Sequence, residues 1–326
     1  MRYVFGPVPS RRLGQSLGID TIPLKTCNWN CVYCQLGRTR PVTNERRAYL
    51  PPDHILAEVR QALAAHSPDE IDWVTFVGSG EPTLHADIGL LIRQVKAMTD
   101  LPVAVITNGA LLYQPAMREE LVAANAVLPT LDAGTAELFR KINRPHSEST
   151  FERLVTGLIA FRREYTGELW LEVMLVRGMN DTEVALRDLA AALRRIRPDE
   201  VHLSLPTRPP AEPWVQPPDE EGLMRAVAIL GESAHVVHPA GEGFALSGDS
   251  VIESVIGIIS RHPMRQEELE RTLDRWMPGQ VGETLAALEA SGKAQVVERY
   301  GVRYWSAGGA HYPEEHIPDS HAPERQ

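Results

Sequence analysis

The sequence predicts an α/β fold: a partial (β/α)6 barrel, TIM-like but incomplete, followed by a small C-terminal winged-helix-like domain. Two observations predict the barrel. β-Rich runs alternate with helical runs from residue 17 to residue 230, which is typical of βαβ units with a parallel sheet. Six such units are counted, whereas a closed barrel has eight. A third observation, helical runs followed by a hairpin after residue 249, predicts the second domain.

The elements follow from local patterns. The run 53–65 places Ile55, Leu56, Val59 and Leu63 on one helical face. Because the carboxyl ends of parallel strands meet at one edge, the site is expected there. Strands are expected at 17–22, 72–77, 103–107, 127–131, 169–175 and 201–205, and further helices at 88–98, 115–124, 149–164, 181–195 and 220–230.

Bulk properties exclude several classes of protein. The chain has 326 residues, 43% hydrophobic and 23% charged, which is ordinary for a globular protein of two domains. Its net charge of −10 argues against broad, charge-driven nucleic-acid binding. No apolar run approaches the ~18 residues of a membrane span, and residues 1–7 lack the apolar region of a signal peptide. With its free thiols, the chain is expected to be cytoplasmic.

All three cysteines, Cys27, Cys31 and Cys34, lie within eight residues. An odd number in a long chain does not indicate a disulfide framework. Cysteine thiolate is the usual ligand of iron in iron–sulfur clusters, so the loop predicts a [4Fe–4S] cluster with one iron open to a non-protein ligand. Zinc is the alternative, but it needs a fourth ligand at zinc spacing, and the next histidine, His54, is on an expected helix.

The spacing C-x3-C-x2-C, with the aromatic Tyr33 before the last cysteine, resembles the radical S-adenosylmethionine (SAM) superfamily. In that family the open iron binds the amino and carboxylate groups of SAM, and an electron from the cluster cleaves a C–S bond. Residues 6–14, 16–20 and 31–37 also resemble a group of iron–sulfur oxidoreductases distantly similar to tRNA wyosine-base synthases. The resemblance covers about residues 1–245 and also implies a partial barrel. The chain lacks the additional cysteines with which wyosine synthases bind a second cluster.

The segment 78–83 follows an expected strand and contains Gly78, Gly80 and Glu81. Glycines let the backbone approach a ligand closely. Alone, such a stretch is more often a tight turn. Beside the cysteine loop it resembles the family's Gly-Glu motif, which implies that its backbone and the Glu81 carboxylate orient the SAM ammonium.

Three further positions end expected strands. Asn108 and Asp132 stand in Asn-Gly and Asp-x-Gly sequences, which are also ordinary turn formers. The resemblance implies that both contact the ribose and methionine parts of SAM. It also implies that Val176 makes an apolar contact with the adenine, which Tyr33 borders.

Arginines near the expected barrel mouth favour an anionic substrate, since arginine binds phosphate and carboxylate in a bidentate manner; for any single one, surface solvation is the alternative. They are Arg11, Arg12, Arg144 and Arg208. The proline-rich run 207–214 cannot be helix or central strand. It is either a linker or a loop that covers the mouth.

After residue 249, helices are expected at 251–261, 265–274 and 281–291 and a hairpin at 294–298 and 302–305, which predicts a winged helix. The third helix carries Glu283 and Glu289 but no lysine or arginine, a poor composition for phosphate contact. Packing on the barrel or holding a macromolecular substrate is expected instead. From residue 307 the tail has little to bury, and disorder is expected.

The sequence therefore predicts a barrel domain over 1–245, a winged-helix-like domain over 249–306 and a disordered tail over 307–326. The expected function is reductive SAM cleavage by a [4Fe–4S] enzyme, an oxidoreductase or transferase, that starts radical chemistry on an anionic small molecule or an RNA base. The sequence assigns no catalytic residue beyond the cluster and does not decide which C–S bond breaks. The expected partners are an electron donor such as flavodoxin or ferredoxin, and tRNA. The alternative is a non-catalytic redox sensor that reads DNA through its C-terminal domain.

Overall fold

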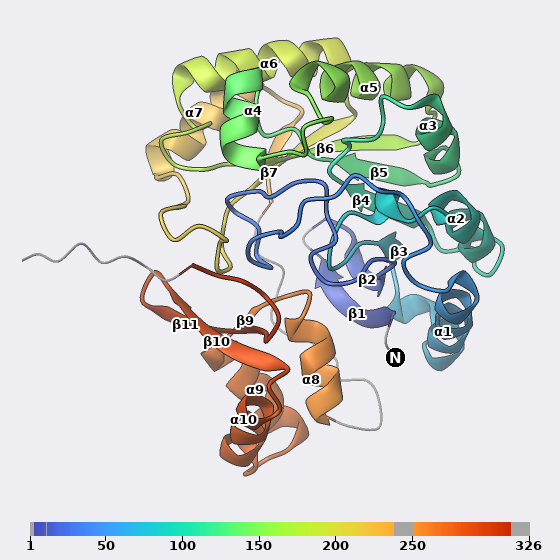
Figure 1. Ribbon diagram of the computed structural model, residues 1–326, viewed down its shortest axis with the longest axis vertical. Coiled ribbons are helices and arrows are strands. Elements are labelled where there is room, and N and C mark those ends of the chain that lie inside the picture. The colour runs from blue at the N-terminus through green and yellow to red at the C-terminus, as the bar shows by residue number, and fades with distance from the viewer. Residues whose placement is uncertain (1–2, 11, 238–250, 314–326) are drawn as a thin grey trace, which may run out of the picture.

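The computed structural model describes residues 3–10, 12–237 and 251–313 (Figure 1). One sheet runs in sequence order from β1 to β8. Its first two strands pair antiparallel, and every later neighbour is parallel. β1 and β8 are its two edges, so the described barrel is open. The strands are β1 (Val4–Ser10), β2 (Gly14–Ile19), β3 (Trp73–Phe76), β4 (Val103–Thr107), β5 (Ala126–Pro129), β6 (Glu168–Met174), β7 (Glu200–Ser204) and β8 (Ala234–Val236).

Helices cover the outer face of this sheet (Figure 1). Four of them begin at a side-chain cap, Thr135, Thr150, Thr182 or Asp219, which accepts a backbone N–H of the first turn. The helices are α1 (Pro52–Ala65), α2 (Ile88–Lys96), α3 (Pro115–Leu121), α4 (Ala136–Asn143), α5 (Phe151–Glu164), α6 (Glu183–Ile196) and α7 (Glu220–Leu230), with short 3-10 turns η1 (Pro68–Glu70) and η2 (Pro82–Leu84).

The two faces of β6 show how the sheet divides core from site. Leu169, Leu171 and Val173 are fully buried in the core that the sheet shares with the outer helices. Because side chains alternate along a strand, Glu172 and Met174 point to the opposite, inner face, where they line a cavity.

The partial barrel of six βα units is confirmed, and the described residues add β1, β8 and α4 to the predicted elements. The sequence did not predict β1 because it contains Pro7 and Pro9. Proline is a poor strand residue that is tolerated only at a sheet edge, where β1 lies. β8 has only three residues and α4 only eight, too few for a clear periodic pattern.

The C-terminal residues form three helices and a three-stranded antiparallel sheet in the order β10-β11-β9. The expected helices and hairpin are present, together with the short strand β9; their assignment as a winged-helix domain stays a prediction. The unit lies against β1 in Figure 1, and one hydrophobic cluster joins Phe5 and Val8 of β1 to Ile259, Met264 and Trp305. The elements are α8 (Val251–Ile259), β9 (Met264–Arg265), α9 (Gln266–Trp276), α10 (Val281–Ala290), β10 (Ala294–Arg299) and β11 (Val302–Ala307).

The predicted disordered tail is wrong for residues 307–313. β11 extends to Ala307, the Arg38 amide donates to the His311 carbonyl at 2.8 Å, and the Tyr312 hydroxyl donates to the Gln35 carbonyl. These partners lie in the cysteine loop, so local composition could not reveal them. Residues 314–326, and the predicted domain boundary between 245 and 249, lie outside the described residues. Among the described residues, no helix has both the length and the apolar character that a membrane crossing needs.

Candidate active site

The cysteine loop joins β2 to α1 and is held by backbone hydrogen bonds to the end of α4. The Val32 amide donates to the Ile142 carbonyl at 2.9 Å, and the Asn30 amide to the Asn143 carbonyl at 3.0 Å. The side chain of Trp29, within the loop, is buried. Its ring packs edge-on against the ring of Phe139, with 5.1 Å between the ring centroids. The loop therefore has one fixed path over the sheet.

Each cysteine sulfur lies near an N–H donor. Cys27 Sγ is 3.4 Å from the Trp29 amide, Cys31 Sγ is 3.6 Å from Asn143 Nδ2, and Cys34 Sγ is 3.0 Å from Lys25 Nζ. Hydrogen bonds to the sulfurs are among the features that tune iron–sulfur clusters. The donor set thus fits three thiolate ligands.

The three thiols are free and half-buried. Burial raises the pKa of Cys27 to about 12 and raises the pKa of Cys31 well above its ordinary value. A metal centre must therefore displace these protons when it binds. The described residues contain no group of three His, Cys, Asp or Glu side chains gathered about one ion. A cubane does not require one, because each ligated iron binds its own cysteine.

Lys25 is a site residue that sequence reasoning missed. Burial alone would lower the pKa of Lys25, but the neighbouring sulfurs, Cys34 first, hold it above its ordinary value. The residue adopts a left-handed backbone with φ of 60°. Its only sequence signal is its position two residues before Cys27.

Glu81 is 2% exposed and is held by four donors. Oε1 accepts from the Thr83 amide and hydroxyl at 3.0 and 2.6 Å and from the Thr107 hydroxyl at 2.6 Å, while Oε2 accepts from the Asn108 amide at 2.7 Å. Burial raises its pKa despite these bonds. Oε2 retains capacity for one further donor, so the predicted ammonium contact stays a prediction.

Gly78 and Gly80 have a packing role as well as the predicted ligand role. A Cβ on Gly80 would stand 1.9 Å from the Thr26 carbonyl oxygen, and one on Gly78 2.3 Å from the Asp20 carboxyl. Only glycine lets the end of β3 approach the cysteine loop this closely.

Asp132 and Tyr33 form a buried pair behind the loop. The Tyr33 hydroxyl donates to Asp132 Oδ2 at 2.5 Å, and Asn143 Nδ2 donates to the same oxygen at 2.6 Å. Burial raises the pKa of Asp132 to about 6. Asp132 is 1% exposed and Val176 0% exposed, and neither lines the described cavities. Their direct contacts with SAM stay a prediction: Asp132 is hydrogen-bonded to Tyr33, and Val176 belongs to a buried cluster against which Tyr33 packs.

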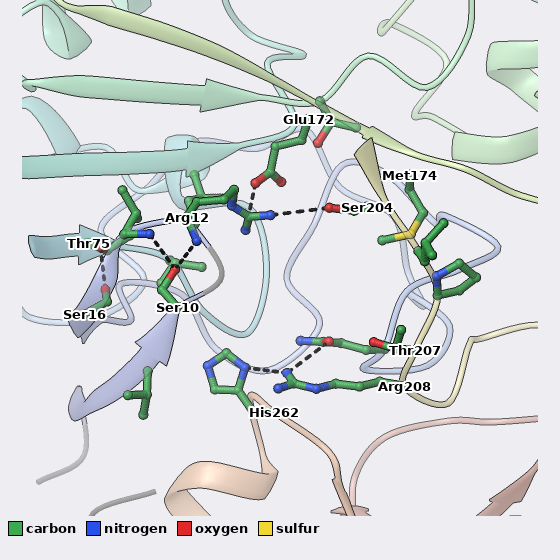
Figure 2. Close-up of a pocket in the computed structure, with 18 of the residues that line it drawn as sticks. Ser10, Arg12, Ser16, Thr75, Glu172, Met174, Ser204, Thr207, Arg208 and His262 are labelled. Carbon is green, nitrogen blue, oxygen red and sulfur yellow. Dashed lines mark hydrogen bonds and ion pairs between the residues drawn. The ribbon is translucent and has the colours of Figure 1, made fainter. Parts of the chain in front are cut away.

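Two adjoining cavities lie on the inner side of the sheet. The smaller, about 190 Å³, contains most of the predicted cofactor residues: it is lined by Cys27, Cys31, Gly78, Gly80, Glu81 and Asn108. The larger, about 340 Å³, contains Cys34 and polar groups of β6 and β7 (Figure 2). Both are lined by Tyr33, Val77, Ile106 and Thr130. A molecule in one cavity therefore lies beside a molecule in the other.

Two of the four arginines predicted to bind an anionic substrate are paired with carboxylates. Arg12 Nη2 lies 2.8 Å from Glu172 Oε1, and Arg144 contacts Glu212. Arg208 Nη1 lies 2.8 Å from His262 Nδ1. Arg11 lies outside the described residues. The expected basic lining is therefore corrected for Arg12 and Arg144, because partners distant in sequence offset their charge.

The proline-rich segment lines the larger cavity with Thr207 and Arg208 and is not a linker. Glu212 is 3% exposed and receives both Arg38 Nε at 2.8 Å and Arg38 Nη2 at 2.6 Å. Its amide donates to the Val32 carbonyl at 2.9 Å. The segment is thus fastened to the cysteine loop.

Comparison with known proteins identifies the family. The model described as the radical SAM superfamily matches residues 21–190, just over half of the chain and including the cysteine loop. The chain belongs to the radical SAM superfamily. Enzymes of this superfamily use a [4Fe–4S] cluster and SAM and need an electron donor, so the prediction of a radical SAM enzyme is confirmed.

Three similar proteins show how far the likeness to known proteins extends. A UPF0026 protein of Methanocaldococcus jannaschii is 37% identical over 281 residues, 84% of this chain and 87% of that one. A protein named GTPase Obg from Brachyspira hyodysenteriae is 47% identical over 207 residues, 64% of this chain, but the chain spans only 30% of its length. The crystal structure of a radical SAM methyltransferase from Sphaerobacter thermophilus has a TM-score of 0.53 at 19% identity, covering 68% of this chain and 65% of that one. This last likeness supports the fold alone, and the likeness to wyosine synthases stays a prediction.

Proposed function

We propose that Cys27, Cys31 and Cys34 hold one [4Fe–4S] cluster with SAM on its open iron, and that the chain starts radical chemistry on a substrate in the larger cavity. When bound, the cluster supplies the electron that cleaves a C–S bond of SAM. The observation that carries the proposal is the smaller cavity: two of the cysteines share it with Gly78, Gly80 and Glu81, and it adjoins a second, polar cavity.

The chain's own residues hold and screen this centre. The Trp29 amide, Asn143 and Lys25 donate to the three sulfurs. Asn108 Nδ2 lies 3.8 Å from Cys27 Sγ and 2.5 Å from Asn28 Oδ1, so it links the end of β4 to the loop. The segment fastened at Glu212 limits access of water from the mouth. Exclusion of water protects reactive intermediates from side reactions.

Several finer assignments belong to this proposal. Tyr33 and Asn108 contact SAM directly, whereas Asp132 and Val176 act by supporting Tyr33. The electron donor is a flavodoxin or a ferredoxin, and the free thiols suit the reducing cytoplasm. The substrate is a small molecule or an RNA base, with tRNA as the macromolecular candidate. Residues 1–245 form the catalytic domain and residues 249–306 a winged-helix-like domain.

The DNA-reading sensor is not favoured. Helix α10 has Glu283 and Glu289 and no basic residue, whereas a reading helix needs phosphate contacts. The C-terminal unit also shares its hydrophobic cluster with β1.

The test of the proposal is SAM cleavage. Anaerobically reconstituted, reduced protein is incubated with SAM, and the products are separated. The proposal expects 5′-deoxyadenosine and methionine, or methylthioadenosine if the other C–S bond breaks. The Cys31→Ser variant is the control and should give neither. Absence of both products from the wild type, together with tight sequence-specific DNA binding, would support the sensor instead.

A further inference from the structure

An ion pair on the wall of the larger cavity indicates which class of substrate this site accepts. The inference rests on the proposed function. Arg12, from the turn between β1 and β2, and Glu172, from the middle of β6, meet on its wall at 2.8 Å, and each side chain is 16% exposed. Arg12 Nη1 also lies 3.5 Å from Ser204 Oγ. The turn is held by Ser10 Oγ, which accepts from the Arg12 and Leu13 amides at 3.4 and 3.3 Å. Figure 2 shows the pair beside the open space.

This pair has hydrogen-bonding capacity that the described residues do not use. Arg12 Nε is buried and donates to none of them, and Glu172 Oε1, although close to Arg12, makes no well-aligned hydrogen bond with any of them. Buried polar groups left in this way cost free energy. Both of these atoms are shielded from solvent, so a ligand in the cavity would reach the pair through the part of each side chain that stays exposed, accepting from the guanidinium and donating to the carboxylate.

The charge balance favours a neutral ligand group. Glu172 offsets Arg12, so a phosphate or carboxylate drawn to Arg12 would meet a second carboxylate 2.8 Å from the same guanidinium. A zwitterion would bury two further charges, each at a cost of several kcal/mol. A neutral C=O beside an N–H satisfies both partners without that cost.

We propose that Arg12 and Glu172 recognise the lactam edge of a nucleobase, a ring C=O next to a ring N–H as in guanine, hypoxanthine or uracil. Arg12 donates to the carbonyl oxygen, and Glu172 accepts from the ring N–H. The substrate of the proposed radical chemistry is thus a base of this class, held beside the cofactor cavity through the shared wall of Tyr33, Val77, Ile106 and Thr130.

The C-terminal unit supplies another part of the cavity wall. His262, which follows α8, lines the cavity and lies 2.8 Å from Arg208 (Figure 2). The C-terminal unit that carries His262 is fixed by the Arg261–Asp20 ion pair at 2.8 Å, with Asp20 3% exposed. The cavity of about 340 Å³ is in the range of small-ligand sites.

The experiment measures nucleoside binding by equilibrium dialysis, with full-length reconstituted protein and SAM. Guanosine, inosine and uridine carry the lactam edge; adenosine, cytidine and 1-methylguanosine lack it or have it blocked. Wild-type protein should retain the first set and bind the second at least about tenfold more weakly, as expected for loss of a hydrogen bond to a charged group. An unfractionated tRNA arm distinguishes a base within RNA from a free nucleoside.

The variants assign the binding to the pair. Glu172→Gln should weaken binding of the lactam set at least about tenfold. Glu168→Gln, at an exposed position of the same strand, should not change it. The double variant Arg12→Met/Glu172→Leu leaves no orphan charge and neither a donor nor an acceptor at the pair, so it should fold but lose binding, which separates recognition from misfolding.

Failure of this inference is distinguishable from failure of the proposed function. If SAM is cleaved but no lactam nucleoside or tRNA is retained, or if retention survives in the double variant, the inference is overturned and the function stands. Retention of α-amino acids that depends on Glu172 would also overturn it. If no cluster forms, dialysis with iron-free protein still tests the cavity, because the pair contains no metal ligand.

Discussion

Lys25 Nζ lies 3.0 Å from Cys34 Sγ, inside the loop that carries all three cysteines. A cation that donates to a cluster thiolate stabilises the more negative, reduced cluster. The Lys25→Met variant should therefore lower the midpoint potential of the reconstituted cluster, by on the order of 50 mV, which for one electron is about a tenfold change in equilibrium constant. The measurement is a redox titration followed by electron paramagnetic resonance. Lys25→Arg should restore most of the potential, and an unchanged potential in Lys25→Met would show that the contact does not tune the cluster.

Gly80 is predicted to be indispensable to the cysteine loop. In Gly80→Ala the new methyl would stand 1.9 Å from the Thr26 carbonyl oxygen, so that the loop or the end of β3 must shift. Iron bound per chain after reconstitution should fall to a small fraction of the wild-type value. Gly257→Ala in α8 is the matched control, since nothing lies within 4 Å of its Cβ. That control should keep full iron and gain stability of up to about 1 kcal/mol, because alanine favours helix. Equal iron in both variants would contradict the packing argument.

Glu212 should make stability depend on pH. Burial alone would raise its pKa, but the hydrogen bonds from Arg38 and Arg144 lower it below the ordinary value. The stabilisation is therefore present above the unfolded pKa of about 4.3 and is lost as the pH falls through the lower, folded pKa. Glu212→Gln should lower the midpoint of thermal unfolding by a few degrees at pH 7, and the difference should shrink in acid.

The control for this titration is Glu183→Gln, whose ion pair with Arg187 on α6 is 61% and 68% exposed. Such exposed pairs contribute little, so its unfolding midpoint should match the wild type at every pH. A Glu212 effect that stayed constant through the whole acid titration would rule out the ion pair as its cause.

The buried Arg261–Asp20 pair is expected to fasten the C-terminal unit to the barrel. Asp20 Oδ2 receives Arg261 Nε at 2.8 Å and the Ser79 hydroxyl at 2.6 Å. Arg261→Met should cost about 3 kcal/mol, because it leaves a buried carboxylate without its cation. Arg261→Met combined with Asp20→Asn should cost less than the sum of the single variants, measured as a double-mutant cycle. Strict additivity would mean that the two side chains are not coupled.

Sequence patterns identified site residues that are neighbours in the chain and missed contacts between residues far apart in the chain. Cys27, Cys31 and Cys34 are neighbours in sequence, so their spacing was enough to identify them. Arg12 and Glu172 are far apart in the chain, and only the closure of β6 toward the β1–β2 turn brings them together. The contact of His311 with the cysteine loop could not be predicted for the same reason, since the two segments are far apart in the chain.

Burial was the second thing that the sequence could not reveal. Asp132 ends its strand as predicted, but its side chain points behind the loop, where Tyr33, Asn143 and the Met174 amide all donate to it. An Asp-x-Gly turn looks the same from sequence whether its carboxylate faces a cavity or the core.

The central claim is tested most directly by the iron content of the three-cysteine loop. Anaerobic reconstitution of the full chain should give about four irons per chain, as one cubane requires. It should also give a reduced-cluster resonance that changes when SAM is added. Cys27→Ser, Cys31→Ser and Cys34→Ser should each lose the iron and the resonance. Stoichiometric zinc with no iron–sulfur absorption, or a resonance indifferent to SAM, would contradict the account.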